Sequence, residues 1–179
     1  MAEKTRRASR PAARRAPRPD DLYRLLIPTD PRLSPDGASV AFTVQRTAPS
    51  FDGYRTALWL APTDGSEDAR RLTIGSKHDN HPRWSPDGRT LAFLSDRRTV
   101  VEEEPTASKE REDAMQVHLL PVDRAGEARR LTDLPRGVEA FEWSPDGTKL
   151  AVLSSSRSAD RAADTKARRR LDEAKPGTP

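Results

Sequence analysis

Large apolar and small residues alternate after each of three Ser-Pro-Asp-Gly tetrapeptides in this chain. Neighbouring side chains of a strand point to opposite faces, so large side chains share one face and alanine occupies the other. An alanine recurring at one position predicts a closely packed sheet face. The three segments are VAF at 40–42, LAF at 91–93 and LAV at 150–152.

A second pair of segments repeats with the same spacing. LWLAPTDGSEDARRLT (58–73) aligns with VHLLPVDRAGEARRLT (117–132) at a step of 59 residues, which also separates Ser85 from Ser144. The step from Ser34 to Ser85 is 51, and the difference falls in a charged loop at 100–113. One unit of about 50–60 residues is therefore repeated, and such repeats indicate propellers or solenoids.

The sequence pattern of the repeated unit predicts four short strands. The first strand ends before the tetrapeptide, in which Pro fixes φ and Gly permits a left-handed exit, as a hairpin turn requires. The alternating segment is the second strand, LWLAP or VHLLP the third, and ARRLT the fourth. Four antiparallel strands at this period are typical of β-propeller blades.

This pattern predicts an all-β chain that forms an incomplete propeller of about two and a half blades. A closed ring needs 4–8 blades, so we expect the third blade to present unpaired strand edges. The predicted boundaries are a disordered basic lead-in at 1–19, a partial propeller at 20–156 and a charged tail at 157–179. Within the propeller, the blades span about 30–73, 79–132 and 138–156. Helical turns are expected only at 20–26 and within 157–174.

The lead-in DDLYRLLIPTDPRLSPDG, followed by PRWSPDGRTLAFLSDR, resembles the prolyl-oligopeptidase family of serine peptidases over roughly residues 20–156. Its acylaminoacyl-peptidase and dipeptidyl-aminopeptidase-like branch is the most similar, and the repeats also resemble those of TolB-like propellers. The resemblance implies a propeller that restricts access to a C-terminal α/β-hydrolase domain. No Gly-x-Ser-x-Gly occurs in the chain, so we expect that domain to be absent and this chain alone to be inactive.

Charge and composition limit the classes of partner that we expect for this chain. The net charge of +4 comes from residues 1–18, which hold seven Lys or Arg and one Glu, while residues 19–179 are about −2. We therefore expect neither nucleic acid nor a membrane as partner. The chain has no cysteine, which excludes disulfides and Cys-ligated zinc. No apolar region follows Arg6 and Arg7, so we expect no secretory signal and a cytoplasmic location.

Two stretches could suggest metal binding. His78 and His81 have H-x-x-H spacing, but an extended backbone would place their side chains on opposite faces. Residues 64–68, DGSED, are acidic, yet the equivalent loop of the next unit contains Arg124, a poor neighbour for calcium. We interpret the first as a loop-to-strand junction and the second as a hairpin turn.

The other candidates also favour structural roles. Residues 102–104 and 109–113 form a mixed-charge loop that could contact a partner or a substrate amine, but such loops are usually solvated. Residues 154–156, SSS, give no basis for a Ser-His-Asp group with the three histidines. Trp84 and Trp143 occupy the same position in successive repeats, and we expect both in the core between blades. The aspartates of the three turns, Asp36, Asp87 and Asp146, are expected to cap their turns by hydrogen bonds to the backbone.

We therefore assign no catalytic, metal or cofactor residue and expect no cofactor. The predicted function is that of a propeller portion of a peptidase acting on short peptides, whose substrate would be bound with the missing catalytic domain. The alternative is a TolB-like propeller that serves as a protein-interaction scaffold. Exposed blade edges also predict weak stability or self-association.

Overall fold

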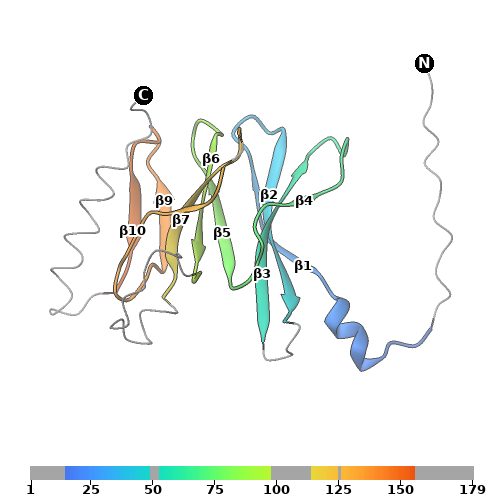
Figure 1. Cartoon of the computed structure of the whole chain (residues 1–179). Helices are drawn as coiled ribbons and strands as arrows, with labels where there is room; N and C mark the ends of the chain where they lie inside the picture. Colours follow the sequence, from blue (N-terminus) through green and yellow to red (C-terminus); the bar gives the residue numbers. More distant parts are fainter. Residues whose placement is uncertain (1–14, 49–52, 98–113, 125, 156–179) are drawn as a thin grey trace, which may run out of the picture.

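Short antiparallel strands make up nearly all of the regular structure in the computed structural model, which describes residues 15–48, 53–97, 114–124 and 126–155. The strands form two sheets of four and one of two, with orders β1-β2-β3-β4, β5-β6-β7-β8 and β10-β9 (Figure 1). Sheet one comprises β1 (Ile27–Leu33), β2 (Ser39–Thr47), β3 (Tyr54–Pro62) and β4 (Arg70–Arg71). Sheet two comprises β5 (Asp79–Trp84), β6 (Thr90–Ser95), β7 (Gln116–Pro121) and β8 (Arg129–Arg130). The third comprises β9 (Ala140–Trp143) and β10 (Leu150–Leu153).

The three sheets, here called blades one to three, lie side by side in chain order (Figure 1). Their first strands are in contact, β1 with β5 and β5 with β9. The predicted all-β fold and the incomplete propeller are thus confirmed, because the sheets do not close into a ring. The side of the array that the first strands β1, β5 and β9 form is called the inner edge below.

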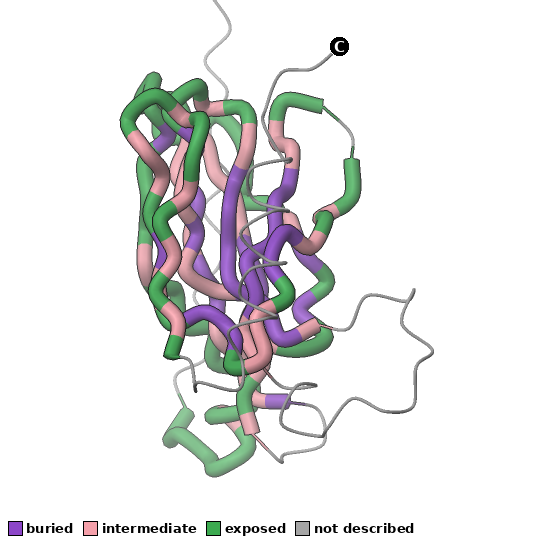
Figure 2. Tube along the Cα trace, turned by 90° about the vertical axis from the view of Figure 1, so that its left-hand side faces the viewer, coloured by how far each residue is buried: buried purple, intermediate pink, exposed green. Residues whose placement is uncertain are grey.

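Blade two is the only described blade with a neighbour on both faces. On one face Phe93 and Leu120 pack against Leu58 of blade one. On the other face Ala92 and Val117 belong to a cluster that reaches blade three. Figure 2 shows this buried band running through the middle of the array. Each fully buried Leu or Phe side chain contributes roughly 1.5–3 kcal/mol, so these shared faces stabilise the packing of one blade on the next.

The alternation of large residues and alanine has a directional meaning. Leu150 and Val152 of β10 pack toward blade two, just as Phe93 packs toward blade one. The alanine face points toward the following blade, so Ala92 is fully buried while Ala151 is exposed. The same residue type is therefore core or surface according to whether another blade follows among the described residues.

A short helix of the 3-10 type, η1 (Pro19–Arg24), precedes β1 in the described part of the chain. Proline occupies its first position, and the Asp21 carboxylate accepts a hydrogen bond of 2.8 Å from the Arg18 backbone N–H. The helical turn expected at 20–26 is therefore present, beginning one residue and ending two residues earlier. The predicted helical turns in 157–174 lie outside the described residues. No helix among those the structure describes is long and apolar enough to cross a membrane.

The fourth strands are shorter than the predicted ARRLT. Only the two arginines pair with the third strand in blade one and in blade two, and the Leu and Thr that follow turn inward. The Thr73 hydroxyl accepts a hydrogen bond of 3.0 Å from the Leu58 N–H, and Thr132 does the same for Val117 at 2.9 Å. The motif therefore encodes a side-chain cap on the third strand as well as a strand.

Candidate functional site

The three Ser-Pro-Asp-Gly segments form one hydrogen-bonded circuit, repeated in each blade. In blade three, the Ser144 hydroxyl donates to Asp146 Oδ1 at 2.5 Å and accepts from the Lys149 N–H at 2.9 Å. The Asp146 carboxylate also accepts from the Thr148 N–H at 3.0 Å. The prediction that these aspartates cap their turns is confirmed. The same contacts recur at Ser34 with Asp36 and at Ser85 with Asp87.

These circuits stabilise the ionised carboxylates. The serine hydroxyl and the backbone N–H hold the pKa of each aspartate below its ordinary value. At Asp146 the Thr148 hydroxyl adds a third hydrogen bond, and together these contacts lower its pKa to about 2. Three donors aimed at one carboxylate favour its charged form, so the turns keep this geometry at neutral pH.

Successive turns also touch each other. A Cβ added to Gly88 would lie 3.5 Å from the Pro35 ring, and one added to Gly147 would lie 3.3 Å from the Pro86 ring. Both glycines have positive φ, 72° and 68°. The positive φ is what favours glycine at both positions; at Gly147 a Cβ would also crowd the proline ring of the preceding blade, whereas at Gly88 it would make ordinary contact. The turns are contact points between blades.

The two tryptophans lie beside these turns and point toward the preceding blade. Trp84 Nε1 donates to the Arg32 carbonyl oxygen at 2.9 Å, and Trp143 Nε1 donates to the Arg83 carbonyl oxygen at 3.2 Å. Both bonds join the same positions of neighbouring blades. The expectation of core positions between blades is met only in part, because both indoles are half-buried and of the two only Trp143 packs against a core cluster of the described residues. Both fasten one first strand to the next by a hydrogen bond.

A bulge recurs in the inner strands of blades one and two. The strand register shifts between Thr29 and Arg32 and between Asn80 and Arg83. Within each bulge a residue with positive φ precedes a proline: Asp30 at 48° and His81 at 57°. The predicted extended backbone at His81 is therefore wrong, because the bulge turns that residue into the left-handed region. Such bulges re-aim side chains.

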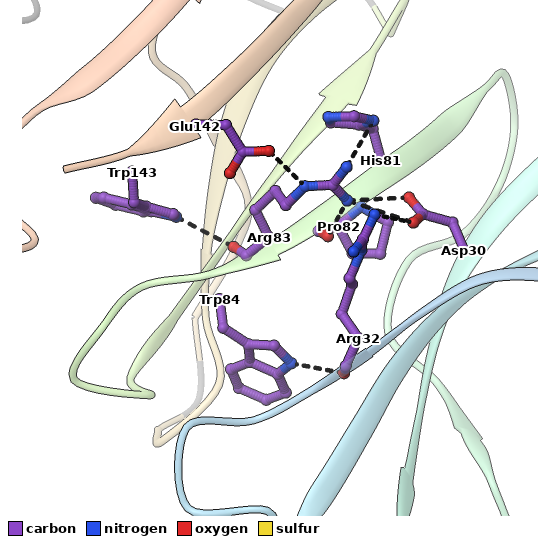
Figure 3. A network of polar contacts seen from close by, with 8 residues as sticks. All are labelled: Asp30, Arg32, His81, Pro82, Arg83, Trp84, Glu142 and Trp143. Carbon is purple, nitrogen blue, oxygen red and sulfur yellow. Dashed lines mark hydrogen bonds and ion pairs between the residues drawn. The ribbon is translucent and has the colours of Figure 1, made fainter. Parts of the chain in front are cut away.

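The bulge directs Arg83 into a polar network that spans all three blades (Figure 3). Its Nη1 lies 3.1 Å from Asp30 Oδ2 on β1, and its Nε lies 3.2 Å from Glu142 Oε1 on β9. Asp30 also pairs with Arg32 at 2.8 Å. The Arg83 side chain is only 13% exposed, whereas its partners Asp30 and Glu142 are 27% and 69% exposed, so a partly buried guanidinium bridges one half-buried and one largely exposed carboxylate.

His81 completes the network on the side of blade three. Its Nδ1 lies 3.3 Å from Arg83 Nη2, and its ring meets that of Phe141 edge to face at 5.3 Å. Its Nε2 is buried without a hydrogen-bond partner among the described residues. Burial, and then the positive charge of Arg83, hold the pKa of His81 below its ordinary value.

His78 and His81 do not form a metal pair in the structure. His78 Nδ1 lies 2.7 Å from Asp96 Oδ2, and the backbone N–H of His78 donates to Asp96 Oδ1. His81 instead contacts Arg83. Within the described ranges, no group of three or more His, Asp or Glu side chains is arranged to hold a metal ion. The interpretation as a loop-to-strand junction is consistent with this geometry.

The acidic stretch at 64–68 lies in the loop between β3 and β4. Asp64 Oδ1 accepts a hydrogen bond of 2.9 Å from the Ser66 N–H, which holds the pKa of Asp64 below its ordinary value. Gly65 between them has a φ of 68°. This is a side-chain-capped turn. The charged loop at 102–104 and 109–113 lies outside the described residues.

Blade two contains a buried polar cluster that the sequence patterns missed. Asp79 is 3% exposed, pairs with Arg97 at 2.7 Å and accepts from the Ser95 hydroxyl at 2.6 Å. The Arg97 guanidinium lies over the Phe93 ring, on which His118 stacks. Burial lowers the pKa of His118 to about 4, so this histidine is neutral at pH 7. In the aligned positions of blade one, Pro28 replaces Asp79 and Val44 replaces Ser95. Two polar residues where the other repeat has apolar ones are the signal in the sequence that could have pointed to this cluster.

The contacts of these described residues fasten one blade to the next. Among them no serine hydroxyl bonds to a histidine; Ser154, for example, donates to the Gly137 carbonyl oxygen. The charged residues of the inner edge neutralise one another across blades. The candidate functional site is therefore the polar network on this inner edge, which consists of Asp30, Arg32, His81, Arg83 and Glu142.

No family model matches the chain, but curated relatives do. An uncharacterized peptidase of Bacillus subtilis, YuxL, is 38% identical over 136 residues, which cover 76% of this chain and 18% of the relative. Dipeptidyl-peptidase 5 of Porphyromonas endodontalis is 30% identical over 132 residues, which cover 74% of this chain and 17% of the relative. The chain thus spans less than a fifth of the length of these two relatives.

Solved structures show the same fold. Acylaminoacyl peptidase of Pyrococcus horikoshii matches with a TM-score of 0.55 at 18% identity, over 76% of this chain and 18% of that one. TolB of Acinetobacter baumannii matches with a TM-score of 0.50 at 23% identity, over 72% and 27%. The sequence repeats, the fold and the peptidase relatives agree, and the described blades are those of the propeller region found in prolyl-oligopeptidase-family serine peptidases.

Proposed function

We propose that this chain supplies part of the propeller of a serine peptidase that acts on short peptides. In this proposal the propeller restricts access to a hydrolase domain that lies outside the chain. The observation that carries it is the 38% identity to a protein named as a peptidase, which extends over 76% of the chain. A cytoplasmic location also stays a prediction.

The inner edge supports the gating part of the proposal. The polar bridges and the two indole hydrogen bonds join consecutive inner strands. A fastened inner edge holds the blades at a constant spacing, which a size-selective entrance to a catalytic chamber needs. The shared apolar faces between blades supply the remaining rigidity.

The reading frame beyond codon 179 gives a direct test. Further blades followed by Gly-x-Ser-x-Gly, and then by Asp and His, would support the peptidase. A frame that stops after the last blade would contradict it and favour the interaction scaffold.

A biochemical test uses a fluorophosphonate probe, which labels activated serines. The 179-residue chain should remain unlabelled, and the product of the longer frame should be labelled and should cleave short peptides. In the longer product, weakening the inner edge by Arg83→Met should let longer peptides be cleaved. Unchanged length selectivity in a folded Arg83→Met protein would contradict the gating role.

A further inference from the structure

His81 occupies the one place where all three described blades meet through polar side chains (Figure 3). It belongs to β5, while β1 supplies Asp30 and Arg32 and β9 supplies Glu142. The paired stretch of β6 offers only apolar residues there, from Ala92 to Leu94. Strands β2 and β3 also pack against β5, but the charges that act on His81 are those of Arg83, Asp30, Glu142 and Arg32, two positive and two negative.

The contact with Arg83 fixes the proton arrangement of His81. Arg83 Nη2 can only donate a hydrogen bond, so His81 Nδ1, 3.3 Å away, must accept it. An imidazole that accepts at Nδ1 is uncharged and carries its proton on Nε2. Protonation of Nδ1 would place two donors against each other and a second positive charge beside Arg83.

The charges of the network give this proton a structural consequence. With His81 neutral, Arg83 and Arg32 are balanced by Asp30 and Glu142. With His81 protonated, the junction carries one excess positive charge in a half-buried position. Arg83 is the group that can respond, because its guanidinium is the bridge from β5 to both β1 and β9.

We propose that His81 is an acid-sensitive latch on the inner edge of the propeller. Unprotonated His81 holds Arg83 in the bridge between Asp30 and Glu142, and protonation releases Arg83 and loosens blade three from blade two. This latch goes beyond the proposed peptidase role and does not depend on it. The burial that lowers the pKa of His81 is consistent with the neutral latched form.

The first test measures the protonation of His81 in the unmodified 179-residue chain. Exchange of the imidazole C2 hydrogen for deuterium, followed by mass spectrometry of peptides, reports the midpoint of each histidine separately, even in an associated sample. The expected midpoint of His81 lies below the ordinary value of about 6.5 and rises in Arg83→Met. A midpoint at or above that value would overturn the latch.

The second test asks whether that proton loosens the blades. Backbone amide exchange, corrected for intrinsic rates, is compared at neutral and mildly acidic pH for β9 and β3. Acid should speed exchange in β9 more than in β3, by about tenfold for each unit by which the His81 midpoint is lowered. His81→Gln keeps an acceptor for Arg83 but cannot be protonated, so it should abolish the difference.

His78→Gln is the matched control, because His78 contacts Asp96 and lies outside the inner edge. It should keep the acid response of the unmodified chain. An equal response in His81→Gln would show that His81 does not set it and would overturn the proposal.

Discussion

Trp143 Nε1 donates a hydrogen bond of 3.2 Å to the carbonyl oxygen of Arg83, 60 residues earlier. Trp84 makes the same bond of 2.9 Å to Arg32 in the preceding blade. Strand β9 therefore contacts Arg83 twice, because Trp143 binds its backbone carbonyl and Glu142 pairs with its side chain. The inner edge is thus fastened twice at one position.

Replacing either indole by phenylalanine should weaken the contact between blades. Trp143→Phe and Trp84→Phe keep an aromatic ring but remove the N–H donor, and a hydrogen bond of this kind contributes about 0.5–1.5 kcal/mol. Urea unfolding should show a loss of roughly that size for each variant. Trp59→Phe on β3 is the matched control, since that indole makes none of these inter-blade bonds, and an equal loss there would argue against a role specific to the inner edge.

The Thr132 hydroxyl should contribute more than its position in a short motif suggests. It is 1% exposed, accepts from the Val117 N–H and donates to Gln116 Oε1 at 2.7 Å. Thr132→Val keeps the volume but leaves a buried N–H unsatisfied, which costs about 1–3 kcal/mol. The free energy of unfolding measured in urea should fall by this amount, whereas Thr132→Ser should lose less than half as much.

Asp146 should remain ionised in acid to a lower pH than an ordinary aspartate. Its pKa is lowered to about 2, so the stability it contributes is present above the ordinary value of 3.8 and disappears as the pH falls toward 2. Carbon-13 NMR titration of the side-chain carboxyl measures this directly. Thr148→Val removes one of three donors and should raise the pKa of Asp146, while Thr148→Ser should leave it near that of the unmodified chain.

Local chemistry explains which features the sequence could predict. The turn at Ser85 and Asp87 follows from the residues of the turn itself, since its hydrogen bonds span at most five positions. The strands follow from alternation over a few residues, and their grouping into blades follows from the repeat. Each of these signals is contained in a short window of sequence or in its repetition.

The inner edge could not be predicted because its contacts join residues that are far apart in the sequence. Arg83 meets Asp30 and Glu142 at separations of 53 and 59 residues. The bulge that aims it depends on a positive φ at His81, and the enrichment of histidine at positive φ is too weak to locate a bulge in a sequence. The only available signal was the shared Pro-Arg before Leu33 and Trp84, which blade three lacks together with the bulge.

The open edge of blade three should mediate self-association of the 179-residue chain. Within the described residues β10 pairs only with β9, whereas β2 and β6 are each flanked by strands on both sides. Leu153 on β10 is 60% exposed, and an unpaired edge with an apolar side chain is a template for pairing with another copy. Analytical ultracentrifugation should therefore show concentration-dependent oligomers, which Leu153→Lys should shift toward monomer. Ile74→Lys, which replaces a 77% exposed apolar side chain outside the strands, is the control. Monomer at all concentrations, or an equal shift in both variants, would contradict pairing through β10.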